Sequence, residues 1–187
     1  AGNDTLTATA ASVLMGGAGN DTFVISNAMI TALQNPMGAG GNTTQLARID
    51  GGSGMDTLML AGAGLTLDLT RVANPAASNP SGSSRINGVE IIDITGSGNN
   101  TLRLNLSDLL DMGSANLFQP NGRQQLLVKG NSGDTVNVLG HTNLWRETVV
   151  NSDFDRDGVQ ETYKVLSHET SLAILYVSNS VSLTYPW

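Results

Sequence analysis

Apolar and polar residues alternate along several short stretches of the chain. This alternation is found at 65–69, 102–106 and 136–138, and we include 58–60, where Met59 lies between two leucines, as a strand of the same kind. Alternation with a period of two places all apolar side chains on one face of a β-strand, where they can be buried together. The pattern therefore predicts short strands that each bury one face. A brief helical turn is expected at 107–112.

A glycine-rich phrase recurs between these stretches. Three copies are nearly identical: AGNDTL at 1–6, GGAGNDTF at 16–23 and GGSGMDTL at 51–58. Two looser versions follow at 96–102, with Asn100 in place of the aspartate, and at 130–136. Glycine reaches backbone conformations that other residues avoid, so each phrase predicts a tight turn that leads into a strand.

The acidic positions of these phrases follow a nearly regular period. Asp4 and Asp21 are 17 residues apart, and Asp56 follows Asp21 after 35. Asn100 comes 44 residues after Asp56, and removing about nine residues of the Pro- and Ser-rich segment 74–84 restores the period. Short strands joined by glycine turns at a fixed period are typical of a β-solenoid, in which each coil packs against its neighbours.

The character of the sequence changes near Gly140, after which aromatic residues become frequent. Strand-like stretches are found at 148–151, 162–166, 172–177 and 181–185. Their short polar turns predict an antiparallel meander. We therefore expect an all-β fold, with a parallel β-roll or β-solenoid at 1–140 and an antiparallel β cap at 141–187 that covers the open strand edges. The cap could also hold a secretion signal.

Composition and charge narrow the choice of function. Sixteen acidic and nine basic residues give a net charge of −7, which argues against nucleic acid or an anionic membrane as a partner. The chain has no cysteine, which excludes disulfides and thiolate metal sites. The apolar run 172–177 is far too short for a membrane span. No signal peptide precedes the first phrase, and we expect a segment of a longer protein.

The phrases offer the ligands of a calcium site. Calcium takes roughly six to eight oxygen ligands and accepts both carbonyls and carboxylates. One turn supplies too few, but two turns spaced 17 residues apart could enclose an ion between them. The candidate ligand residues are Gly2, Asp4, Gly16, Gly17, Ala18, Gly19, Asp21, Gly51, Gly52, Ser53, Gly54 and Asp56. Ordinary β-turns without an ion are the alternative, because Asn, Asp and Gly are common in turns.

The phrases resemble the nonapeptide of repeats-in-toxin (RTX) proteins, a calcium-binding β-helix repeat. This resemblance implies a parallel β-roll over about 1–140, with calcium between successive coils. The phrase at 86–102 is similar to the C-terminal region of large biofilm adhesins exported by type I secretion. In that family, the C-terminal segment leads export and folds in external calcium. The sequence departs from the repeat at 7–12, so one side of the roll is expected to be free of ions.

A separate acidic loop at 153–161 forms a second candidate calcium site. It begins like an EF-hand, but Lys164 stands where an EF-hand needs its last glutamate. Because strands are predicted on both sides, the loop more closely resembles the hairpin calcium loops of integrin-type propeller repeats. The ligands that this resemblance implies are Asp153, Asp155, Asp157, the Val159 carbonyl and Glu161. A plain hairpin turned at 157–158 is the alternative.

The sequence shows no constellation of catalytic residues, and His141 and His168 are isolated from each other, so we do not expect an enzyme. The leading hypothesis is a calcium-dependent folding module of a secreted bacterial RTX adhesin. It would be unfolded for type I export and folded by extracellular calcium. One alternative is the calcium-binding roll of a secreted protease or lipase. Another alternative is a calcium-dependent module that itself binds a surface glycan or protein. In the leading hypothesis, such a glycan or protein could instead be bound by other domains of the adhesin.

Overall fold

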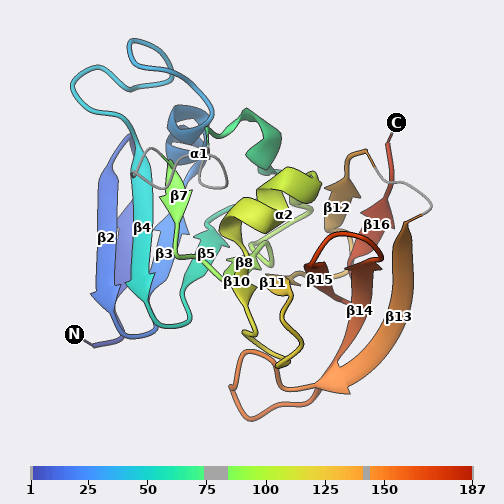
Figure 1. Cartoon of the computed structure of the whole chain (residues 1–187). Coiled ribbons are helices and arrows are strands. Elements are labelled where there is room, and N and C mark those ends of the chain that lie inside the picture. Colours follow the sequence, from blue (N-terminus) through green and yellow to red (C-terminus); the bar gives the residue numbers. More distant parts are fainter. Residues whose placement is uncertain (1, 74–83, 141–143, 187) are drawn as a thin grey trace.

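The computed structural model describes residues 2–73, 84–140 and 144–186, and their fold is predominantly β (Figure 1). The all-β prediction is confirmed at this level, with strands in parallel and mixed sheets. The α-helices of the described residues are α1 (Asn27–Leu33) and α2 (Leu106–Met112). Each has seven residues, and neither is long and apolar enough to cross a membrane. Helix α2 corresponds to the helical turn predicted at 107–112.

The largest sheet, called the main sheet here, consists mainly of parallel strands. These are β1 (Thr5–Ala8), β3 (Thr22–Ile25), β5 (Thr57–Leu60), β8 (Ile91–Asp93), β11 (Gln124–Lys129) and β15 (Ala173–Ser178), in that order. Antiparallel strands β14 (Glu161–His168) and β13 (Trp145–Ser152) extend the sheet beyond β15, and β10 (Ser114–Ala115) pairs with β11.

Two smaller parallel sheets complete the fold. The first small sheet contains β2 (Val13–Ala18), β4 (Arg48–Ser53) and β7 (Ile86–Asn87). The second contains β6 (Thr66–Asp68), β9 (Thr101–Leu104), β12 (Thr135–Val138) and β16 (Ser182–Thr184), and a short 3-10 helix η1 (Leu69–Arg71) follows β6. Figure 1 shows β2 and β4 at one end of the molecule and the β13–β14 hairpin at the other. The glycine phrases carry the chain between the small sheets and the main sheet.

The inner faces of all three sheets share one hydrophobic core. Phe23 and Leu58 of the main sheet, Ile49 of the first small sheet and Leu102 of the second are completely buried in the same cluster. Apolar residues at alternate positions of the predicted strands are buried, as the period of two requires. A second cluster, on the opposite face of the main sheet, includes Tyr163, Tyr176 and Phe154.

The predicted C-terminal meander is only partly correct. Strands β13, β14 and β15 are antiparallel neighbours, but β16 pairs in parallel with β12 of the second small sheet. The reason is that β15 lies beside β11, so the turn after β15 follows the turn after β11 into the second small sheet. The domain boundary near residue 140 stays a prediction. The segment 74–83 and His141 lie outside the described residues, whereas Ser84 is buried.

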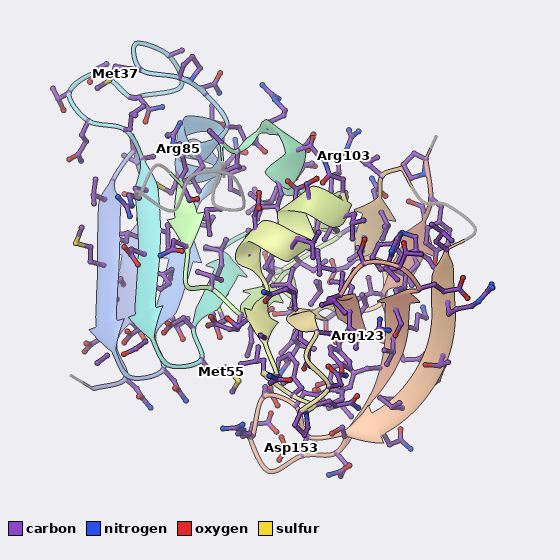
Figure 2. All side chains as sticks on the ribbon, viewed as in Figure 1. Met37, Met55, Arg85, Arg103, Arg123 and Asp153 are labelled. Carbon is purple, nitrogen blue, oxygen red and sulfur yellow. The ribbon has the colours of Figure 1, made fainter. Side chains whose placement is uncertain are left out.

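Helix α1 and the loop after it were not predicted from the sequence. The Ser26 hydroxyl caps the helix by accepting a hydrogen bond from the Met29 N–H (3.4 Å). At the other end, the buried Arg85 guanidinium donates to the carbonyls of Ala32 (2.9 Å) and Asn35 (2.6 Å) (Figure 2). These bonds satisfy carbonyls that a helix end leaves free, and they tie the loop to the first small sheet.

Candidate functional site

The three predicted glycine turns lie side by side where the chain begins successive strands of the main sheet. The Asp4 N–H donates a hydrogen bond to Asp21 Oδ1 (2.8 Å), and the Asp21 N–H donates to Asp56 Oδ1 (2.7 Å). The residue after each aspartate pairs with its counterpart in the next strand. The prediction that the Asp4 and Asp21 turns stack as neighbours is therefore confirmed. The Asp56 turn also stacks directly on the Asp21 turn, although its spacing of 35 residues corresponds to two of the predicted 17-residue periods. We call this row of bonds, which continues to Glu90, the first ladder.

The residue that follows Asp56 in the ladder is Glu90, and the expectation that Asn100 would follow it is wrong. The Asp56 N–H donates to Glu90 Oε2 (2.9 Å), across 34 residues. Asn100 belongs to a second ladder, in which the Leu65 N–H donates to Asn100 Oδ1 and the Asn100 N–H to Asp134 Oδ1, both at 2.8 Å. The reason is that the Asn100 turn comes after β8, where the chain leaves the main sheet for the second small sheet.

The aspartates of the first ladder are buried and only half satisfied. Asp21 is 1% exposed and Asp56 is fully buried, yet the Oδ2 atom of each has no hydrogen-bond partner. A Cβ atom on Gly16 would lie 2.2 Å from Asp21 Oδ2 and 2.7 Å from the Gly51 carbonyl oxygen. On Gly51 it would lie 2.5 Å from Asp56 Oδ2 and 1.8 Å from the Gly88 carbonyl oxygen. At both glycines, two oxygen acceptors thus face the same small space.

The buried acidic residues of the first ladder create an environment that favours the binding of a cation. Burial raises the pKa of Asp56, and the nearby charges of Asp21 and Asp50 raise it further, against the hydrogen bond from the Asp21 N–H. Burial likewise raises the pKa of Glu90. Carboxylate and carbonyl oxygens are the ligands that calcium accepts. The oxygens around Gly16 and Gly51 therefore fit the predicted ion.

The other predicted ligands of the glycine phrases mainly serve the stacking of the turns. The Gly2 N–H donates to the Ala18 carbonyl (2.9 Å), and the Gly19 N–H donates to the Ser53 carbonyl (3.0 Å). Asp4 is exposed at the end of the ladder. Gly17, Gly52 and Gly54 lie where the backbones of adjacent turns touch. The sequence did not indicate Gly88, whose carbonyl faces Asp56.

The acidic loop connects β13 to β14 as the predicted hairpin, and Asp153 lies at the lower edge of the view in Figure 2. Carboxylate oxygens of Asp153, Asp155 and Asp157 lie within 4.8 Å of one another. The Gly158 N–H donates to Asp153 Oδ2 (3.0 Å), and the Val159 N–H donates to Asp157 Oδ1 (2.8 Å). Of the remaining predicted ligands, Val159 is exposed, and Glu161 accepts a hydrogen bond from the Tyr163 hydroxyl.

Lys129 of β11 extends into this acidic loop. Its ammonium donates a hydrogen bond to Asp155 and lies 3.9 Å from carboxylate oxygens of both Asp157 and Glu161. Burial disfavours the charged lysine, but these three carboxylates outweigh burial and raise its pKa. A positive charge of the chain itself thus stands among the predicted ligands. The sequence could not show this, because the contact joins a strand to a loop 26 residues away.

Replacing Lys129 by methionine should strengthen calcium binding at this loop. Methionine keeps an unbranched side chain but removes the charge that repels an incoming cation, and we expect a gain of about tenfold in affinity, or about 1.4 kcal/mol. Isothermal titration calorimetry would measure it. Lys164→Met is the control, because the Lys164 ammonium bonds the Val181 carbonyl (2.6 Å). Equal affinities in both variants would show that Lys129 does not compete.

A cleft of about 240 Å³ lies between the two candidate regions, on the outer face of the main sheet. Asn20 and Asp21 of the second glycine phrase line it together with Asp93, Lys129 and Asp155. The glycine turns and the acidic hairpin, far apart in the sequence, therefore border one polar depression.

His168 is buried and makes contacts that hold a turn of the fold. It is 5% exposed, its Nδ1 accepts a hydrogen bond from the Ser171 N–H (3.0 Å), and its ring lies edge-on to Trp145 at 4.9 Å between centroids. These contacts fix the turn between β14 and β15.

No family model, curated protein or solved structure matches this chain. The resemblance to RTX proteins accordingly rests on the glycine phrases of this sequence.

Proposed function

We propose that this chain is a calcium-dependent folding module of a secreted bacterial adhesin of the RTX kind. In this proposal, the three sheets are the walls of a parallel β-roll, and the glycine phrases are its turns. The parallel registers of the sheets support this reading. The observation that carries the proposal is the pair of buried, unpartnered oxygens, Asp21 Oδ2 and Asp56 Oδ2, each facing a carbonyl of the next turn.

Each aspartate joins two turns in this proposal. Its Oδ1 holds the N–H of the preceding turn, and its Oδ2 and a carbonyl of the following turn, Gly51 or Gly88, would hold calcium. The bound ion supplies the positive charge that neutralises the buried carboxylates. Without that charge, the cost of burying Asp21 and Asp56 opposes the closure of the turns. Folding is therefore linked to calcium binding.

This linkage suits a protein that is exported unfolded. Binding to the folded state alone stabilises that state in proportion to the logarithm of ligand concentration over Kd. Calcium is scarce inside cells and abundant outside, so the chain stays open for a type I secretion channel and closes at the cell surface or in the medium. The proposed partners are calcium and the secretion machinery, and the proposed role is structural rather than catalytic.

The test is a calcium titration of the whole chain, followed by circular dichroism and small-angle scattering. We expect an expanded chain in excess chelator, compaction on addition of calcium, and a much weaker response to magnesium. The double variant Asp21→Ala with Asp56→Ala should lose most of the calcium response. Glu169→Ala, which removes only an exposed ion pair with Arg146, should keep it. A chain that is equally compact and stable in chelator would contradict the proposal.

A further inference from the structure

The second ladder contains a neutral residue at the position of the buried aspartates. Asn100 is fully buried, and its Oδ1 accepts the N–H of Leu65, 35 residues earlier. In the first ladder, Asp56 Oδ1 accepts the N–H of Asp21, also 35 residues earlier. Both residues stand immediately before a strand, β9 and β5. Asn100 and Asp56 are therefore structural equivalents in different ladders.

The two residues differ in the second atom of the side chain. Asn100 Nδ2 donates hydrogen bonds to the carbonyls of Gly62 (3.1 Å) and Ile94 (3.0 Å). A Cβ atom on Gly96 would lie 2.3 Å from this nitrogen and 2.2 Å from the Gly62 oxygen, so the space over Gly96 holds a donor and an acceptor. The partners fix the amide orientation, because a carbonyl can accept only from Nδ2 and an N–H can donate only to Oδ1.

The carboxylates that follow Asp56 and Asn100 in the two ladders, Glu90 and Asp134, have hydrogen-bond partners on both of their oxygens. Asp134 Oδ1 accepts the Asn100 N–H, and its Oδ2 accepts the Asn131 N–H (2.6 Å). Glu90 Oε1 accepts a hydrogen bond from the Ser114 hydroxyl (2.9 Å), in addition to the Asp56 N–H on Oε2. Among the ladder residues that the structure describes, a buried carboxylate oxygen without a partner is found only at Asp21 and Asp56.

We infer that the amide of Asn100 is a built-in substitute for the cation, so that the second ladder closes without metal. This inference rests on the proposed function, in which calcium joins the turns of the first ladder. Of the two ladders, only the first then depends on calcium, at the turns 16–21 and 51–56. In chelator, where the turns of the first ladder open and the chain expands, the second ladder is then the part of the module that keeps residual structure.

Exchanging the two side chains tests the inference. Asp56→Asn places an amide beside the Gly88 carbonyl and should reproduce the bonds of Asn100. In the full-length chain, we expect this variant to bind one calcium fewer and to melt in chelator at a higher temperature than the wild type. Asn100→Asp removes the donor to Gly62 and Ile94. We expect it to melt at a lower temperature in chelator and to show a larger calcium-induced shift.

Calorimetry for the ion count and thermal unfolding in chelator and in calcium give the readouts. A wild type that does not respond to calcium would refute the proposed function. Two results would refute only the inference, provided that the wild type responds to calcium. One is an Asn100→Asp variant that is no more calcium-dependent than the wild type, and the other is an Asp56→Asn variant that is less stable than the wild type in chelator.

Hydrogen exchange of the wild type in chelator decides the matter if either variant fails to fold in calcium. Slow exchange of the Asn100 and Thr135 amides, with fast exchange of the Asp21 and Thr57 amides, would support the inference. The two pairs are comparable because Asn100 and Asp21 each donate to the side chain of the next ladder residue, and Thr135 and Thr57 each donate to a ladder residue's carbonyl. Equal protection of the two ladders would overturn it.

Discussion

Replacement of Gly51 by alanine should remove most of the stability of the module, even in saturating calcium. The new Cβ would lie 1.8 Å from the Gly88 carbonyl oxygen and 2.5 Å from Asp56 Oδ2. The first of these atoms belongs to the backbone, so no side-chain rotation can relieve the clash. The turn that holds Gly51 and the turn that holds Gly88 would have to separate, which breaks the hydrogen bond from Asp56 to Glu90.

The expected loss is about 4 kcal/mol or more, because side-chain overpacking alone costs about 1–3 kcal/mol and here backbone meets backbone. Chemical denaturation in calcium would measure it. Gly17→Ala is the matched control in the preceding turn. Gly17 has φ +99° and nothing within 4 Å of an added Cβ, so only backbone strain of about 1–2 kcal/mol is expected. Similar losses in the two variants would show that close stacking at Gly51 is not the cause.

Local patterns predicted much of the fold, because the residues that define each strand are close in sequence. Leu102 with Leu104, and Val136 with Val138, alternate with polar residues and are buried as expected. Strand β2 was missed because Gly16 and Gly17 interrupt its second half, and glycine is unfavourable in strands. Helix α1 has fewer than two full turns, too few for a helical period to be recognised.

In the candidate site, too, contacts that follow a regular sequence spacing could be predicted, and contacts that depend on the tertiary fold could not. The stacking of the Asp4 and Asp21 turns could be predicted because it follows the 17-residue spacing. Direct contact between the Asp21 and Asp56 turns could not, because their spacing is twice as long. Glu90 could not, because its own turn lacks most of the phrase and only the distance from Asp56 identifies it. The position of Lys129 depends on how the hairpin folds over the main sheet, and a spacing in the sequence does not reveal that.

The acidic hairpin is anchored to the main sheet by the aromatic ring of Phe154. The ring is 6% exposed and packs against Tyr176, Tyr163 and Phe118, with centroids 4.5, 5.1 and 5.2 Å away. It belongs to the cluster on the outer face of the main sheet. Since Phe154 lies between Asp153 and Asp155 in the chain, its burial fixes the backbone that carries both carboxylates.

Phe154→Ala should therefore destabilise the protein by about 3–5 kcal/mol and weaken cation binding at the hairpin. Denaturation in calcium would give the first quantity and calorimetry the second. Val159→Ala is the control in the same loop, because Val159 is 57% exposed and its loss should change stability by less than about 0.5 kcal/mol. If Phe154→Ala kept the wild-type ion count and affinity, the hairpin carboxylates would not depend on this anchor. If, in addition, the double variant Asp153→Ala with Asp157→Ala bound as many ions as the wild type, the loop would be a plain hairpin with the Lys129 ammonium as the counter-charge of its carboxylates.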